Sequence, residues 1–259
     1  MNIITAYATK NDCYKAAQPM TPVGIVLHST GVNNPNLKRY VDCKSECGIN
    51  LYGNHWNNPS SSIGKVCVHS FIGYDKNKNV RVANILPYTY ACWGCGSGLN
   101  GSYNYNPTGH IQIEMCEDNL KNADYFNQMF ATAAEYCAML CRQFNLSPNT
   151  IVSHAEAHKK GYASNHSDCD HWLKIHGKTM NNFRALVESF LNTSTNYIVR
   201  VTASVLNVRE GAGTNYRITT SIKKNEAYTI VEEKVVSNDV WGRLKSGAGW
   251  ICLTYTQKI

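Results

Sequence analysis

The stretch IVSHAEAHKKGYASNHSDCDHW, residues 151–172, is dense in side chains that bind metal ions. It places four histidines and two aspartates among small residues: His154, His158, His166, His171, Asp168 and Asp170. Imidazole nitrogens and carboxylate oxygens are typical ligands of zinc, and a catalytic zinc ion usually has three protein ligands and one open position for water. The stretch therefore predicts two zinc ligands and one catalytic side chain, with the rest of the first domain built to hold them.

We expect the third ligand to be His28. Residues 24–27 form an apolar, β-branched run, which predicts a buried strand that delivers His28 to its carboxyl end. The residues that follow are small and polar, as at the rim of a site. This environment favours a role for His28 as a metal ligand over a role as a buried core histidine.

Glu114 is the second notable position outside the donor-rich stretch. Residues 110–116, HIQIEMC, alternate between apolar and polar side chains, which predicts a strand with Glu114 near its middle. A glutamate is uncommon at a strand centre and costly to bury. We predict that Glu114 is a general base beside the metal, and the alternative is an exposed strand face.

Several other segments show a clear period. Residues 124–144 predict an amphipathic helix, residues 66–74 and 80–86 predict a hairpin, and Thr179 predicts the start of a last helix. Residues 33–65 predict a long loop with some helix near 37–41, and 151–152 a short strand. Residues 90–105 are rich in glycine and aromatic side chains, so we expect a loop that grips a sugar–peptide chain, with Trp93 binding substrate.

Composition excludes several classes of protein. The 11 cysteines are odd in number and no signal peptide is evident, which argues against a disulfide framework. Cys92 and Cys95 form a CxxC pair, but a redox role is a weak reading without further context. The net charge of +7 suits an anionic polymer, while no basic and aromatic interleaving indicates nucleic-acid binding. No apolar run is long enough for insertion into a membrane.

The pattern changes after residue 191. Residues 192–198 predict a polar linker, and residues 199–259 show short β runs with glycine-rich turns, which predict a small, separate β-barrel. This tail carries nine Lys/Arg against five Asp/Glu, so it is itself basic. We therefore expect a catalytic domain over 1–191 and a binding domain over 199–259.

Three segments together resemble a known family: GIVLHSTG (24–31), HIQIE (110–114) and SHAEAHKKGYASNHSDCDHW (153–172). They look like the zinc-dependent N-acetylmuramoyl-L-alanine amidases of the amidase-2 type, related to peptidoglycan recognition proteins, and among these like phage endolysins and autolysins. The tail, with LNVREGAGTNY (206–216) and GWICL (249–253), resembles a bacterial SH3-like wall-binding domain. The resemblance implies an α/β fold with a mixed central sheet flanked by helices, plus a small all-β SH3-like barrel. It implies cleavage of the amide between N-acetylmuramic acid and L-alanine of the peptidoglycan stem peptide.

The resemblance also implies roles for individual residues. His28, His154 and Asp168 match the family's three zinc-ligand positions. Glu114 matches the glutamate that orients the water, and His166 stands where relatives often have a basic lysine. Histidine in place of lysine at position 166 makes the side chain that would donate to the transition state titratable. Cys169 stands where relatives commonly have proline and is a rival third ligand, although we favour Asp168.

Two other functions remain as alternatives. The same fold can act as a non-catalytic peptidoglycan-binding protein, and a cysteine peptidase that uses Cys92 or Cys95 is the weaker possibility. With no signal peptide evident, we expect synthesis in the cytoplasm and action on the bacterial wall after release. Peptidoglycan is the expected partner, and the sequence leaves the oligomeric state open.

Overall fold

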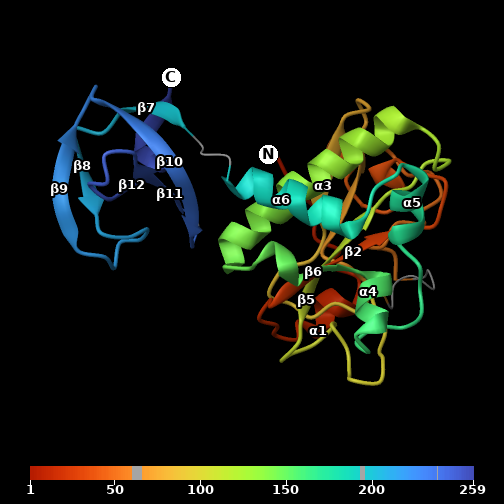
Figure 1. The fold of residues 1–259 in the computed structure, drawn as a ribbon. Helices are drawn as coiled ribbons and strands as arrows, with labels where there is room; N and C mark the ends of the chain where they lie inside the picture. The colour runs from red at the N-terminus through yellow and green to blue at the C-terminus, as the bar shows by residue number, and fades with distance from the viewer. Residues whose placement is uncertain (60–65, 193–195, 238) are drawn as a thin grey trace. The chain divides into compact units, whose positions relative to one another are not determined.

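The protein forms two compact units, Met1–Phe190 and Leu191–Ile259. The computed structural model describes residues 1–59, 66–192, 196–237 and 239–259. The first unit is a mixed sheet with helices on both sides, and the second is an antiparallel sheet (Figure 1). The expected fold class, a mixed α/β domain followed by a β domain, is therefore confirmed.

The sheet of the first unit has six strands in the order β1-β4-β3-β5-β2-β6. Their bounds are β1 Ile4–Thr5, β2 Gly24–Ser29, β3 Ser70–Tyr74, β4 Val80–Asn84, β5 His110–Met115 and β6 Ile151–Ser153. Strands β3 and β4 form the expected antiparallel pair, whereas β2 runs parallel to both β5 and β6. Parallel strands end at the same edge of a sheet, so the carboxyl ends of β2, β5 and β6 lie together.

Both faces of the central strands are covered. All six residues of β2 are buried, as a continuous apolar run predicts for a strand in a parallel sheet. In β5 the alternation predicted one apolar and one polar face, yet Gln112 is fully buried. The exposed-face alternative for this strand is therefore wrong, because Gln112 bonds Asn104 of the loop 91–105 and Glu114 on the same side is half-buried.

The helices lie on the two sides of this sheet (Figure 1). Their bounds are α1 Asp12–Ala16, α2 Lys44–Cys47, α3 Ala123–Phe144, α4 His154–Lys159, α5 Asp170–Ile175 and α6 Met180–Asn192. The described residues also form 3-10 turns at Leu37–Arg39, Pro148–Thr150 and, in the second unit, Leu253–Tyr255. The amphipathic α3 packs on β3 and β4, and α6 packs beside α3 through Phe130 and Phe183, whose ring centroids are 5.3 Å apart. Thr179 accepts a bond from the backbone of Asn182 at 3.3 Å, so it caps α6 as predicted.

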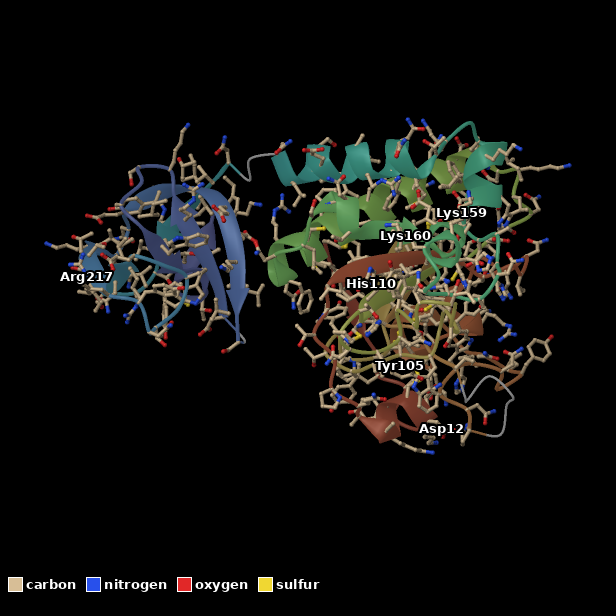
Figure 2. The ribbon with its side chains drawn as sticks, turned by 60° about the horizontal axis from the view of Figure 1, so that its bottom comes forward. Asp12, Tyr105, His110, Lys159, Lys160 and Arg217 are labelled. Carbon is tan, nitrogen blue, oxygen red and sulfur yellow. A yellow bond between two sulfur atoms is a disulfide. The ribbon has the colours of Figure 1, made fainter. Side chains whose placement is uncertain are left out.

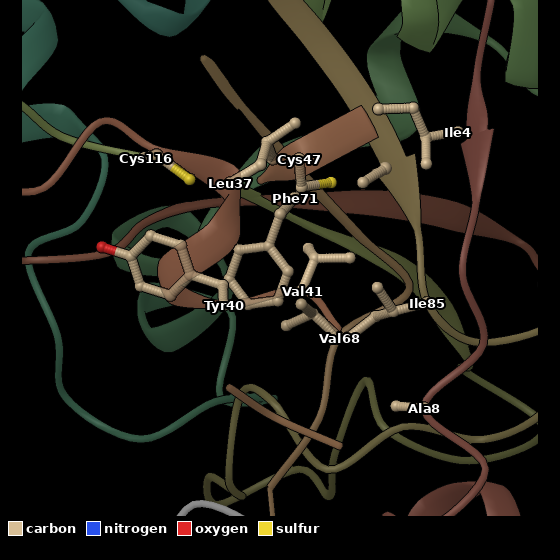
Figure 3. Packing of buried hydrophobic residues seen from close by; sticks show 11 residues of the cluster. Ile4, Ala8, Leu37, Tyr40, Val41, Cys47, Val68, Phe71, Ile85 and Cys116 are labelled. Atoms are coloured by element: carbon tan, nitrogen blue, oxygen red, sulfur yellow. The ribbon is translucent and has the colours of Figure 1, made fainter. Parts of the chain in front are cut away.

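Next to α2 the core contains a cluster of buried apolar side chains that Figure 3 shows from close by. Within it Tyr40 stacks on Phe71 of β3 at 4.9 Å between ring centroids. This contact holds the loop that begins after β2 against the sheet. The expected loop over 33–65 is thus partly packed into the core, and its residues 60–65 lie outside the described part of the chain.

A second set of core contacts fixes the segment before α5. Trp172 is fully buried and meets the ring of Phe126 of α3 edge to face at 5.4 Å. Truncating a buried tryptophan typically costs about 3–5 kcal/mol. The segment that ends at Asp168 is therefore anchored by a large ring four residues further on.

The sequence argued against a disulfide framework, and the described residues contain one disulfide. Cys13 and Cys67, 54 residues apart, are joined by a disulfide. Nine cysteines are free in the described residues. The pairing was not visible from spacing, because α1 meets the segment before β3 only in the folded chain.

The second unit is a seven-stranded antiparallel sheet in the order β13-β7-β10-β11-β12-β8-β9. The bounds are β7 Tyr197–Val201, β8 Val205–Arg209, β9 Ile218–Lys223, β10 Ala227–Val236, β11 Asp239–Leu244, β12 Trp250–Cys252 and β13 Thr256–Lys258. It has its own apolar core, which includes Val208, Ile230 and Ile251. Its basic surface is partly neutralised, as Arg217 (labelled in Figure 2) pairs with Glu210.

The boundary between the two units falls next to the predicted linker. The expected linker over 192–198 overlaps α6 at its start and β7 at its end, and residues 193–195 lie outside the described part. Among the described residues, no helix is both long and apolar enough to span a membrane.

Candidate metal centre and active-site pocket

Three elements deliver the predicted ligands to one edge of the sheet. His28 lies near the carboxyl end of β2, His154 is the first residue of α4 directly after β6, and Asp168 lies just before α5. The strand register places His28 directly beside Glu114 of β5. Residues that are neighbours in a parallel register point to the same side of the sheet, so His28 and Glu114 face the same way. His154 and Asp168 line the same pocket as these two residues.

The donor atoms of the three predicted ligands converge. The His28 Nδ1 atom lies 3.1 Å from Asp168 Oδ2 and 3.1 Å from His154 Nδ1, and His154 Nδ1 lies 3.6 Å from Asp168 Oδ1. Across the described part of the chain, these residues form the one group of three His, Cys, Asp or Glu donors within 4.8 Å of one another. Cys169 does not belong to this group, and its side chain is buried.

This spacing fits a tetrahedral zinc ion. Zinc bonds of about 2.0–2.1 Å place neighbouring ligand atoms about 3.3 Å apart. The three observed separations of 3.1, 3.1 and 3.6 Å lie around that value. Two imidazole nitrogens that face each other and one carboxylate are also the donor types that zinc prefers.

The charge state of the group also suits a cation. Burial alone raises the pKa of Asp168, but the hydrogen bonds and charges of His154 and His28 outweigh it and hold that pKa well below its usual range. Burial lowers the pKa of His28, against the opposing effect of Asp168. A carboxylate that stays ionised and an imidazole that stays neutral are the forms that bind a metal.

The group forms one wall of a pocket of about 380 Å³. The lining residues come from β2 and the turn after it, the loop before β5, β5 itself, and the stretch from α4 to α5: His28, Ser29, Thr30, Gly31, Gly94, Glu114, His154, Ser164, His166, Ser167, Asp168 and His171. Glu114 Oε2 is buried and has no hydrogen-bond partner. Burial raises the pKa of Glu114 well above its ordinary value, and the charges of Asp168 and Glu117 raise it further. A carboxyl in this state holds a proton readily, as a general base must.

His166 lies over the opening of this pocket. Its ring stacks on that of His154 at 4.8 Å between centroids, and its Nδ1 lies 3.8 Å from Asp168 Oδ1. The side chain is 62% exposed. It is therefore close to the candidate ligands but free to contact a bound molecule.

Two lining residues to which the sequence assigned no role, His171 and Ser29, meet at the buried carboxyl group of Glu117. His171 Nε2 lies 2.9 Å from Glu117 Oε1, and Ser29 donates to the same carboxylate oxygen at 2.5 Å. Glu117 is 3% exposed. The only signal in the sequence was the position of these residues, since Glu117 follows β5, Ser29 follows His28, and His171 belongs to the donor-rich stretch.

The remaining donors of that stretch are structural. His158 Nδ1 bonds the backbone oxygen of Ala163 at 3.1 Å, and Asp170 accepts a hydrogen bond from Ser153 Oγ. Lys159 and Lys160, at the end of α4, lie on the surface (Figure 2). None of these four side chains lines the pocket.

Trp93 does not line the pocket, although its neighbour Gly94 does. Its ring is partly buried against a cluster that contains Cys13, Cys67 and Cys92. Its contact with substrate stays a prediction. Burial raises the pKa of Cys95 to about 11, and the pKa of Cys92 rises well above its usual range for the same reason, so neither thiol resembles an activated nucleophile.

Residues 18–172 match the family model of N-acetylmuramoyl-L-alanine amidases. The match spans more than half of the chain, and the protein belongs to this family. The expected function as a peptidoglycan amidase is thus confirmed.

Solved structures agree with this fold. A mutant form of PlyL aligns at 18% identity over 73% of this chain and 99% of that chain, with a TM-score of 0.51. The PlyG catalytic domain aligns at 19% identity over 74% of this chain and 96% of that chain, with a TM-score of 0.50. At these identities the likeness is one of fold. No curated protein sequence gives a significant match.

His69 is a buried histidine of the sheet that lies outside the pocket, and its contacts predict a pH dependence. Its Nδ1 accepts from the Gln112 backbone at 2.9 Å, and its Nε2 donates to the Tyr90 oxygen at 2.9 Å, so only the neutral ring satisfies both. Burial lowers the pKa of His69 to about 4, from 6.5. Because the unfolded chain takes up this proton first, the contribution is complete above about pH 6.5 and is lost as the pH falls toward 4.

We predict that the wild type loses about 2–3 kcal/mol more stability between pH 7 and 4.5 than a His69→Gln variant. A glutamine keeps a donor and an acceptor at this place but does not titrate. Urea unfolding of both metal-free proteins at the two pH values measures the difference. Parallel loss of stability in the two proteins would show that His69 does not contribute.

Proposed function

We propose that the protein is a zinc-dependent amidase in which His28, His154 and Asp168 hold the metal. The observation that carries this proposal is the convergence of three donors, 3.1–3.6 Å apart, in the pocket wall that also contains Glu114. When bound, zinc supplies a Lewis acid that polarises the scissile carbonyl and makes water acidic enough to be a nucleophile near neutral pH.

Glu114 acts as the general base in this proposal. Its Oε2 has no protein partner and its carboxyl takes a proton readily, so it removes a proton from the attacking water. A C–O bond forms at the carbonyl carbon of the lactyl group, and the C–N bond to L-alanine breaks. The proton held by Glu114 passes to the leaving nitrogen, which leaves as the free amino group of the stem peptide.

His166 acts as the donor to the carbonyl oxygen. Its exposed ring, held by stacking on His154, places an N–H group at the pocket opening when it is protonated. One well-aligned donor to a developing oxyanion is worth about 2.7–4 kcal/mol.

The second unit serves, in this proposal, as an SH3-like module that binds the bacterial wall. It has an independent core and a pocket of about 330 Å³ lined by Trp241, Tyr255 and Arg209, among others. A module of this kind raises the local concentration of the enzyme on a polymer without adding catalytic contacts. We propose that the enzyme acts on the wall as an endolysin or autolysin.

The central prediction is that the purified protein contains about one zinc ion and releases new L-alanine amino termini from bacterial walls. Removal of the metal by a chelator abolishes the release, and zinc restores it. Elemental analysis and amino-terminal labelling of digested walls measure the two quantities. Zinc without new amino termini would favour the non-catalytic binding protein, and release that persists without metal would contradict the zinc mechanism.

Replacement of Glu114 by glutamine separates metal binding from chemistry. The Glu114→Gln protein is expected to keep its zinc and to lose about 10²- to 10⁴-fold in turnover, because the amide cannot accept the proton. Turnover and zinc content are compared with those of Glu135→Gln, a half-exposed glutamate on α3. Full turnover in the Glu114 variant would remove this residue from the mechanism.

The role of the second unit is tested by deletion of residues 197–259. We expect lysis of whole cells to fall much more than hydrolysis of soluble peptidoglycan fragments, because only the former needs attachment to the wall. Turbidity loss and amino-group release measure the two activities. Equal losses in both assays would mean that the second unit supports the fold and does not target the enzyme.

A further inference from the structure

The two candidate zinc histidines use the same ring nitrogen toward the metal group. The Nδ1 atoms of His28 and His154 face the centre, so each ring must carry its proton on Nε2 when a metal binds. The acceptors that receive these two protons therefore decide whether the rings are ready to bind. For His28 the acceptor is Gln112 Oε1 at 3.1 Å, and for His154 it is Ser164 Oγ at 3.4 Å.

The amide of Gln112 is held in one orientation. Its Nε2 donates to Asn104 Oδ1 at 2.7 Å and approaches Cys95 Sγ at 3.4 Å. Both Gln112 and Asn104 are almost fully buried, so no water competes for these bonds. Gln112 Oε1 is thereby left as an acceptor that faces His28.

The amide of Asn104 is oriented in turn by the backbone of the turn at Cys95. Asn104 Oδ1 accepts from the Cys95 N–H at 3.2 Å, and Asn104 Nδ2 donates to the Gly96 carbonyl at 3.2 Å. A backbone donor and a backbone acceptor cannot exchange roles. The direction of the chain of bonds from Cys95 through Asn104 and Gln112 to His28 is therefore fixed.

The same turn orients the partner of the other histidine. The Cys95 carbonyl accepts from Ser164 Oγ at 3.2 Å and from the Ser164 backbone N–H at 2.9 Å. The hydroxyl hydrogen is used in this bond, so a lone pair of Ser164 Oγ remains for the Nε2–H of His154. Both histidines thus depend on the peptide groups of one residue.

The glycines beside Cys95 make this approach possible. A Cβ atom at Gly94 would collide with Gln112 Oε1, and one at Gly96 would lie 2.9 Å from Ser164 Oγ. Gly96 also has a φ of +63°, which side chains rarely adopt. The motif CWGCG therefore has a use that its cysteine spacing did not indicate.

We propose that the turn at Cys95, through Gln112 and Ser164, is a positioning device that sets the tautomers of His28 and His154 for zinc. The inference rests on the proposed zinc function. Gln112 is a positioning residue, because it acts on the metal site only through His28. Loss of such a hydrogen-bond partner typically weakens metal affinity 10–100-fold.

The test compares two substitutions at Gln112 with opposite effects. Gln112→Met removes the acceptor for His28, whereas Gln112→Glu keeps an acceptor but loses the donor to Asn104 and buries a charge. We expect the Met variant to bind zinc at least tenfold more weakly than wild type. The Glu variant is expected to bind zinc near the wild-type affinity although it unfolds at a lower temperature.

Zinc affinity is measured on the full-length protein by competition with a chromophoric chelator, and stability by thermal unfolding of the metal-free forms. The matched control is Asn84→Leu, which removes another buried amide of the sheet that bonds His69 and Leu86. It is expected to lose stability but not zinc affinity. Ser164→Ala tests the second histidine, with an expected loss of about two- to tenfold for one neutral hydrogen bond.

The outcomes separate the two levels of the argument. A wild type that binds no zinc overturns the proposed function. A wild type that binds zinc while Gln112→Met binds it equally well overturns the positioning role alone, as does a loss of affinity that follows thermal stability through all the variants. Should the Met variant fail to fold, an unchanged affinity in Ser164→Ala overturns the proposal, and a weakened one supports it.

Discussion

The parallel alignment of β2, β5 and β6 is the constraint on which the site depends. Parallel strands end at one edge, and the register of β2 and β5 sets His28 beside Glu114. Strand β6 pairs with β2 and ends at the residue before His154, the first residue of α4. A slip of one residue in β2 would turn His28 to the opposite side of the sheet. The apolar residues of these strands, buried on both faces, therefore specify the candidate metal centre as much as the donors themselves do.

The cost of gathering polar groups at this edge explains the surrounding network. A buried amide or imidazole without a partner costs about 1–3 kcal/mol, so each polar side chain behind the pocket is bonded to another or to the backbone. Gln112, Asn104 and Cys95 form such a set, and Ser29 with Glu117 forms another. Two atoms of the pocket wall, Glu114 Oε2 and His171 Nδ1, are buried without such a partner, and an unpaired carboxyl oxygen there is consistent with the use of Glu114 in proton transfer.

The proposed function gives the two units different physical tasks. The first combines a rigid sheet with loops that carry polar side chains, which suits chemistry at a fixed point. The second is a small antiparallel sheet with its own core and a net excess of basic residues. A separate basic module suits attachment to an anionic polymer, since attraction between charges needs little geometric precision.

The sequence by itself determined the α/β class, the main strands and helices, and the candidate donors from which the metal group is drawn. Strong periodicity and rare residue types, such as a strand-centre glutamate, are local signals that survive without any knowledge of contacts. Only the tertiary structure decided that Asp168 and not Cys169 belongs to the donor group, that Cys13 pairs with Cys67, and that Gln112 bonds His28. These facts depend on contacts between segments 54 to 140 residues apart, which no local pattern encodes.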